Sequence, residues 1–326
     1  MIDPKMYLND VTDPEIKQEA NRMGFGRGLV EAGHKDVRVV ALCADLTASV
    51  KMDDFAKSYP ERFVEIGVAE QNLVTVGAGM SLAGKVPFIA SYAAFSPGRN
   101  WEQIRTTVCL NEANVKIVGA HAGVSVGPDG ATHQMLEDIA LMRVLPNMTV
   151  IVPADAEEAR KATLVAAATP GGFYIRLARE KSPVITTEKT PFHLDKAQVL
   201  RDGTDLTIVA CGQLVFEALK AAEELYKQGI DVEVINAAVV KPLDIRTIVA
   251  SAKKTGAVLT AEEAQIAGGL GGAVAEALAD HHPVPMTRVG MNDRFGESGE
   301  PAQLLEYFGM TAPHIAKRAI ELLKRK

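Results

Sequence analysis

The chain has 326 residues, a length that fits two average domains better than one or three. Hydrophobic residues make up 47% and charged residues 23% of it, which excludes a largely disordered protein. The formal net charge of −6 argues against nucleic acid as a partner. No apolar run reaches the roughly 20 residues that span a bilayer, so we expect no membrane partner either.

The cysteines and the first residues indicate the compartment. Cys43, Cys109 and Cys211 are far apart and lack metal-ligand spacing. Such an odd, dispersed set is typical of reduced, buried thiols in a cytoplasmic protein rather than of a disulfide framework. The first residues, MIDPKMYLNDVTDPE, are polar and contain two prolines, which predicts neither a signal peptide nor a membrane anchor.

Short apolar runs alternate with longer helical patterns in the first half of the chain. Asp155 is suited to cap one of these helices. The alternation predicts a parallel sheet wrapped by helices. Runs rich in Val and Ile predict buried strands at 37–42, 62–68, 86–91, 115–120, 148–153 and 173–177. Helices are predicted at 69–83, 101–110, 135–144 and 155–168.

The alternation breaks at residues 178–205, where two prolines and many charges predict a linker. We therefore predict an α/β protein of two doubly wound domains, the larger over residues 1–190 and the smaller over 191–326. In the second domain, strands are predicted at 206–211, 232–237, 258–263 and 286–290. Its helices are predicted at 214–228, 244–254, 270–279 and 313–325.

The segment GVAEQN (67–72) lies where a predicted strand ends and a helix begins, the position at which open α/β sheets bind ligands. Glu70 could contact a ligand there or be only an acidic residue in the first helical turn. The helix that follows contains Gly77 and Gly79, each costing about 1 kcal/mol relative to alanine. Close packing, for example against a second chain, would explain them; an irregular helix end is the alternative.

The loop HAGVSVGPDGATH (121–133) follows another predicted strand and carries His121, Asp129 and His133. Imidazoles suit proton transfer to sugar hydroxyls and carbonyls near neutral pH. Plain turn chemistry at Asp129 is a second interpretation. A metal site is the third, although the spacing matches no zinc or iron pattern.

Aromatic side chains gather in the segment SYAAFSPGRNW (91–101). Tyr92 and Phe95 are three residues apart near a strand end, where core packing is the ordinary role. Because aromatic residues make up only 5% of the chain, a platform for a flat heteroaromatic ring is the second interpretation. No GxGxxG opens the first domain and no GxxxxGK[ST] occurs, which argues against the common nucleotide-binding motifs.

Five segments in this order resemble the C-terminal half of transketolase: ALCADL, FVEIGVAEQN, SYAAF, HAGVSVGPDGATHQ and MNDRFGESG. Transketolases bind thiamine diphosphate between the diphosphate-binding and pyrimidine-binding domains of two different subunits. The resemblance implies a pyrimidine-binding domain followed by a C-terminal domain. The diphosphate-binding half, with the GDG motif and the asparagine that hold magnesium, has no counterpart. The chain therefore resembles the smaller subunit of a split transketolase.

The resemblance implies roles at the cofactor. Glu70 corresponds to the catalytic glutamate that bonds a pyrimidine ring nitrogen and so favours the imino tautomer, which deprotonates the thiazolium carbon. Tyr92 and Phe95 correspond to aromatic residues that pack on the pyrimidine. Asp45 corresponds to an aspartate near the cofactor.

The resemblance also implies roles at the substrate. His121 corresponds to a catalytic histidine beside the reacting carbons, Asp129 to a carboxylate that bonds a sugar hydroxyl, and His133 to a substrate histidine. Ser49 and Arg179 correspond to residues that hold the sugar phosphate.

Two departures from the family pattern leave roles open. The family has a second phosphate-binding arginine, and Arg22 lies one position away from the place where that arginine is expected. The segment after Phe95 is one residue longer than usual, which leaves the role of Trp101 open.

The resemblance implies transfer of a two-carbon ketol unit between sugar phosphates, in central pentose phosphate metabolism or a specialised pathway. It also implies self-association and a larger, diphosphate-binding partner in a heterotetramer. Thiamine diphosphate would be shared with that partner, which would hold Mg²⁺, and no metal ligand is assigned to this chain. Deoxyxylulose-phosphate synthases, beta subunits of 2-oxo acid dehydrogenases and a non-catalytic assembly subunit are the alternatives. His121, His133 and Glu70, respectively, argue against them.

Overall fold

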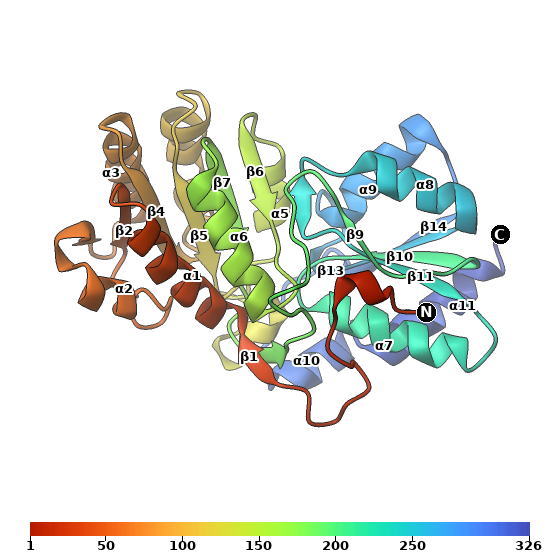
Figure 1. Ribbon diagram of the computed structural model, residues 1–326. Helices are drawn as coiled ribbons and strands as arrows, with labels where there is room; N and C mark the ends of the chain where they lie inside the picture. Colours follow the sequence, from red (N-terminus) through yellow and green to blue (C-terminus); the bar gives the residue numbers. More distant parts are fainter.

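The computed structural model describes residues 1–326 and contains two large sheets side by side (Figure 1). The first sheet has the order β12-β6-β7-β5-β4-β2-β3, in which every pair is parallel except the edge pair β12-β6. Its strands are β2 (Val39–Cys43), β3 (Phe63–Glu65), β4 (Val86–Tyr92), β5 (Lys116–Ala120), β6 (Met148–Ile151), β7 (Gly172–Arg176) and β12 (Val239–Lys241). The six strands predicted in the first half are confirmed.

Helices cover both faces of this sheet. Alternate residues of each strand point to opposite faces, so each strand packs against helices on both sides. In β2, Val39 and Ala41 pack with Phe25 of α1, whereas Val40 and Leu42 pack with Leu73 of α3. Both sides are buried, so the strands read as continuous apolar runs. The helices are α1 (Asn21–Lys35), α2 (Asp53–Ser58), α3 (Glu70–Leu82), α4 (Trp101–Gln103), the π-helix η3 (Ile104–Cys109), α5 (Asp138–Arg143) and α6 (Ala156–Ala168).

Two glycine positions explain close packing in this domain. A Cβ on Gly24 of α1 would lie 1.7 Å from the carbonyl oxygen of Ala156, so only glycine allows α1 to approach α6. A Cβ on Gly77 of α3 would lie 2.8 Å from Cγ2 of Ile89 in β4. Gly77 is therefore required by the chain's own sheet, whereas a Cβ on Gly79 would have no atom within 4 Å.

The second sheet has the order β14-β13-β10-β11-β9, with only the β9-β11 pair antiparallel. Its strands are β9 (Gln198–Arg201), β10 (Leu206–Ala210), β11 (Val232–Asn236), β13 (Val258–Gln265) and β14 (Met286–Met291). In Figure 1, α7 (Leu214–Tyr226) and α11 (Ala312–Leu323) lie on one face, and α8 (Ile245–Thr255) and α9 (Leu270–His281) on the other. The short helix α10 is Pro301–Tyr307. The α/β class with two domains is confirmed.

The structure differs from the prediction between the domains. Within the predicted linker, β8 (Lys181–Pro183) pairs with β1 (Gln18–Ala20), and β9 joins the second sheet. The first residues, assigned to the first domain, contact the second: the amino group of Met1 donates to the carbonyl oxygen of Asp202 at 2.9 Å. The boundary at residue 190 stays a prediction. Three short 3₁₀ helices complete the chain: η1 (Pro4–Met6), η2 (Pro60–Arg62) and η4 (Val124–Asp129).

All three cysteines are free and buried, as predicted. Burial raises the pKa of the Cys43 and Cys109 thiols to about 11, so both stay protonated at neutral pH. None of the helices combines the length and apolar character needed to cross a membrane.

Candidate active site

The candidate site lies at the carboxyl ends of β2, β3, β4 and β5. Parallel strands end at one edge of a sheet, so residues at these ends are brought together. Asp45 lies two residues after β2, Tyr92 ends β4 and His121 follows β5. Glu70 begins α3, after the turn that follows β3.

Four rings form an aromatic cluster at this edge. Tyr92 and His121 stack with their centroids 3.9 Å apart and an interplanar angle of 28°. Phe95 lies 6.0 Å from Tyr92, and His133 meets the Phe95 ring edge-on at 5.4 Å. The loop 121–133 and the segment after β4, which are separate in the sequence, therefore share one surface.

The carboxylate of Glu70 is 1% exposed, and each of its oxygens has a partner. Oε1 accepts from the Ser91 hydroxyl at 3.1 Å, and Oε2 accepts from the Arg99 guanidinium at 2.8 Å. The Asn100 amide donates to the Glu70 backbone carbonyl at 2.9 Å. Sequence reasoning did not select Ser91, Arg99 or Asn100, although the extra residue after Phe95 marked this segment as unusual.

The imidazole of His121 is 2% exposed, with its backbone in the left-handed region at φ 57°. Burial, reinforced by the positive charges of Arg22 and Arg179, lowers its pKa to about 3. His121 is therefore neutral at physiological pH. Its Nδ1 atom is buried without a hydrogen-bond partner, an orphan that a ligand can satisfy.

Two guanidinium groups and a serine converge beside the aromatic cluster. Arg22 donates from Nη1 to the backbone carbonyl of Ser49 at 2.7 Å and from Nε to that of Arg179 at 3.1 Å. The Tyr92 hydroxyl donates to Ser49 Oγ at 3.2 Å. Arg179 donates to the carbonyl of Val126 at 2.6 Å. Arg22, whose role the sequence left open, thus lies within this group.

Asp129 and Asp45 are less tightly held. An oxygen of Asp129 lies 3.8 Å from Arg179 Nη1. Asp45 is exposed, with φ 60°, and its side chain forms no hydrogen bond or ion pair with the other predicted residues. Its backbone N–H donates to Glu65 Oε1 at 2.7 Å, which also accepts from the N–H of Gly67 at 3.0 Å. Glu65, which the sequence did not single out, joins the loops after β2 and β3.

The second domain supports the histidine loop from behind. The N–H of Ser125 donates to Glu263 Oε1 at 2.6 Å, and burial raises the pKa of Glu263. The Gln134 amide donates to the carbonyl of Glu297 at 2.8 Å and to that of Val124 at 3.1 Å. The segment MNDRFGESG therefore helps to hold the histidine loop through the backbone carbonyl of Glu297.

Two other features prove structural. The Trp101 indole donates to the carbonyl of Leu141 at 2.8 Å and packs against the core. Residues 123–127, GVSVG, match the GxSxG pattern of hydrolase nucleophiles. However, Ser125 is 1% exposed and its hydroxyl bonds no histidine, so this serine is not placed as a nucleophile.

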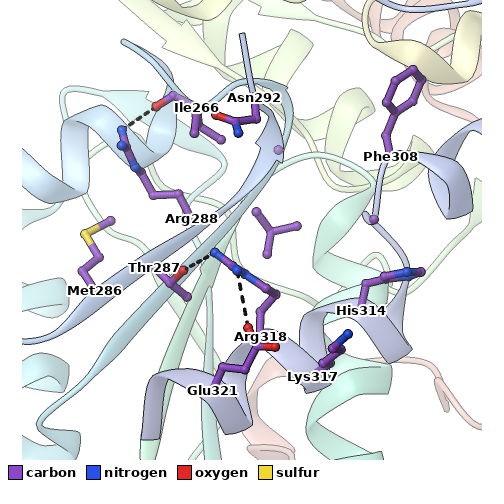
Figure 2. Close-up of a pocket in the computed structure, with 13 residues that line it drawn as sticks. Ile266, Met286, Thr287, Arg288, Asn292, Phe308, His314, Lys317, Arg318 and Glu321 are labelled. Carbon is purple, nitrogen blue, oxygen red and sulfur yellow. Dashed lines mark hydrogen bonds and ion pairs between the residues drawn. The ribbon is translucent and has the colours of Figure 1, made fainter. Parts of the chain in front are cut away.

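A cavity of about 580 Å³ lies elsewhere, between β14 and α11 of the second domain (Figure 2). Its arginines are held by the chain itself: Arg288 donates to the carbonyl of Ile266 at 2.9 Å, and Arg318 donates to Thr287 Oγ1 at 2.9 Å. None of the predicted site residues lines it.

Known proteins match this chain over nearly its whole length. Residues 17–184 match the transketolase pyrimidine-binding domain, and residues 195–315 match the transketolase C-terminal domain. The 6-deoxy-6-sulfo-D-fructose transketolase subunit SqwH of Clostridium sp. (strain MSTE9) is 45% identical over 319 residues, covering 98% of this chain and 99% of that protein. An apulose-4-phosphate transketolase subunit of Phocaeicola vulgatus is 37% identical over 307 residues, covering 94% of this chain and 98% of that protein.

A solved structure described as a split gene transketolase, inactive beta4 tetramer, has a TM-score of 0.88 and 46% identity to this chain. The match covers 94% of this chain and 98% of that one. The chain belongs to the transketolase family and contains its pyrimidine-binding and C-terminal domains. Membership implies the use of thiamine diphosphate and favours transketolase over the other thiamine-dependent enzymes considered above.

Proposed function

We propose that this chain and a larger, diphosphate-binding subunit form a transketolase that transfers a two-carbon ketol unit between sugar phosphates. Thiamine diphosphate would be shared between the two subunits, with Mg²⁺ held by the partner. The observation that carries the proposal is the arrangement at the end of the first sheet. A buried carboxylate lies at one side of a cluster of aromatic rings, and two guanidinium groups lie at the other.

The residues present fit the pyrimidine half of the cofactor. Tyr92 and Phe95 offer ring faces for a heteroaromatic ring, and the orphaned Nδ1 of His121 lies among the same rings. Glu70 reaches the aromatic cluster through the Arg99 guanidinium, which bonds its Oε2 and lies over Phe95, and its carboxylate could share a proton with a ring nitrogen. When bound, thiamine diphosphate would supply the nucleophilic carbon for ketol transfer, and the residues of this chain would orient it and manage protons at its pyrimidine ring.

The substrate roles follow from charge and protonation. Because His121 is neutral, its unpartnered Nδ1 can accept a hydrogen bond from a sugar hydroxyl beside the reacting carbons. Asp129 is exposed and can accept a hydrogen bond from another hydroxyl. His133, at the edge of the ring cluster, can bond a third group of the sugar.

Arg22, Arg179 and Ser49 form the proposed anion-binding end of the site. Arginine forks suit phosphate and sulfonate oxygens. The names of both relatives specify sugars with an anionic group, a 6-sulfo group and a 4-phosphate respectively. We propose a phosphorylated ketose as the donor for this chain, in pentose phosphate metabolism or a more specialised pathway.

The proposed assembly is a heterotetramer of two copies of this chain and two of the larger partner, located in the cytoplasm. Apolar side chains are exposed on and beside α3: Val68 at 71%, Leu82 at 71% and Leu110 at 75%. We propose that these side chains contact another chain in the assembly. Gly79, which has open space beside it, lies on the same helix.

Reconstitution tests the proposal. The chain with its larger partner, thiamine diphosphate and Mg²⁺ should transfer a ketol unit from xylulose 5-phosphate, whereas the chain alone should self-associate in analytical ultracentrifugation but show no turnover. Turnover by the lone chain would contradict the split-subunit proposal. Pyruvate decarboxylation without ketol transfer would contradict the proposed reaction.

A further inference from the structure

Arg99 covers two of the surfaces that the proposed pyrimidine site needs. Its guanidinium donates to Glu70 Oε2 at 2.8 Å, and its central carbon lies 4.8 Å from the centroid of the Phe95 ring. The group therefore occupies the space between the catalytic carboxylate and a ring face proposed to stack on the cofactor.

The backbone of Arg99 is fixed, whereas its side chain has room to move. The backbone N–H donates to the carbonyl of Phe95 at 3.0 Å. The next residue, Asn100, is fully buried and bonds both Glu70 and Ser96. The Arg99 side chain, by contrast, is 49% exposed and has no hydrogen-bond partner other than Glu70.

The charge balance explains why an arginine is needed here. Glu70 is almost completely buried, and a buried carboxylate without a cation or several donors is costly. Besides Arg99, its carboxylate has only the Ser91 hydroxyl as a partner. A guanidinium is also flat and stacks on aromatic faces, which a lysine ammonium does not do.

We propose that Arg99 takes the place of the pyrimidine ring in the cofactor-free chain. It neutralises Glu70 and covers Phe95. It must then swing into solvent before the ring can bind. This inference rests on the proposed function, because it concerns the same cofactor.

The proposal predicts two effects of opposite sign, which a merely structural arginine would not produce. Arg99→Gln leaves Glu70 without its cation, so the cofactor-free lone chain should unfold at least about 2 °C lower. The same change removes a group that competes with the cofactor. The assembled Arg99→Gln complex should therefore bind thiamine diphosphate about three- to tenfold more tightly in the presence of Mg²⁺.

Calorimetric titration and thermal unfolding provide these measurements. Arg105→Gln is the matched control, because Arg105 is an exposed arginine of the same segment without a salt bridge, and it should change neither value. In the Glu70→Gln background, Arg99→Gln should no longer lower the unfolding temperature. If Arg99→Gln fails to fold, Arg99→Lys can be used in its place. Lysine keeps the positive charge but lacks the planar guanidinium that stacks on Phe95, so this variant should also bind the cofactor more tightly than the wild type.

Unchanged or weaker cofactor binding by the folded Arg99 variant would overturn this inference, as would an unchanged unfolding temperature of the lone chain. A wild-type complex that binds no thiamine diphosphate would instead overturn the proposed function. The two failures are therefore distinguishable.

Discussion

The two sheets share an architecture but use their strand ends differently. At the first sheet, Tyr92 and His121 stack on each other, and the Nδ1 atom of His121 has no partner. At the second sheet, β13 carries Glu262 and Glu263 near its end, and the chain's own backbone uses both carboxylates. Glu262 accepts from the N–H groups of Leu270 and Gly271, both at 2.7 Å.

The comparison shows that a strand end as such does not define the site, because the chain's own backbone uses the carboxylates near the end of β13. Burial raises the pKa of Glu262 to about 7. Its carboxylate nevertheless has a structural role, because both of its donors are backbone N–H groups at the start of α9. Glu263 holds the loop that carries His121. The second sheet thus stabilises the histidine loop, which belongs to the candidate site at the first sheet. Substitutions should separate the stabilising role of the second sheet from the proposed catalytic and binding roles of the first.

Glu70→Gln should have the largest effect on activity. Glutamine can bond the ring nitrogen but cannot share a proton in the same way, so kcat should fall at least about 100-fold. The fold should survive, because the interaction lost with the helix dipole is only about 0.3–1 kcal/mol. Turnover of the reconstituted complex at saturating cofactor and circular dichroism of the lone chain test both parts; near-normal turnover would remove Glu70 from the proposed mechanism.

Arg179→Ala should weaken the binding of phosphorylated substrates. A hydrogen bond to a charged group contributes about 1.5–3 kcal/mol, which corresponds to a KM raised about 10- to 100-fold. An unphosphorylated acceptor is the control and should lose much less. Equal losses for both acceptors in steady-state kinetics would make Arg179 a structural residue.

Glu263→Ala should weaken the second domain's support of the loop without removing a reactive group. The Ser125 N–H would lose its buried acceptor, at a cost of about 1–3 kcal/mol in the free energy of unfolding. Glu263→Gln keeps an oxygen in place and should cost less. Urea unfolding of the lone chain measures the difference, and equal stability of both variants and the wild type would show that the loop does not depend on this bond.

His121 should make the stability of the cofactor-free chain sensitive to acid. Its pKa is about 3 in the folded chain and 6.5 ordinarily, so between these values the unfolded chain binds more protons. Stability is thus retained above pH 6.5 and lost as the pH falls toward 3, by up to about 1.4 kcal/mol per pH unit. Urea unfolding of wild type and His121→Asn from about pH 6.5 to 4 should show a shallower fall for the variant; parallel curves would contradict a buried neutral imidazole.

The strands could be predicted well from the sequence because two-sided burial makes them apolar throughout. Helix α1 was missed, since four glycines interrupt it and the reason for Gly24 lies in the distant Ala156. Strand β12 was missed because it is only three residues long and lies beyond the predicted linker.

The site shows the same limit. Tyr92 and His121 could be selected because each comes at the end of an apolar run. Arg99 and Glu263 could not, since each acts on a residue far along the chain, 29 and 138 positions away. The local sequence pattern indicates where a residue lies along a strand, but it does not indicate which distant residue it contacts in the folded chain.

The edge strand β12 affects the order in which the protein can complete its fold. Strands β2 to β7 can pair once residue 176 has been synthesised, but β6 keeps an open edge until Val239–Lys241 arrives. Likewise, the amino group of Met1 cannot form its hydrogen bond until Asp202 has been synthesised. During translation, and in any fragment ending at the predicted linker, the backbone edge of β6 is exposed to other chains and open to aggregation. The two halves of this chain are therefore poor candidates for separate genes, even in a family that includes a split gene transketolase.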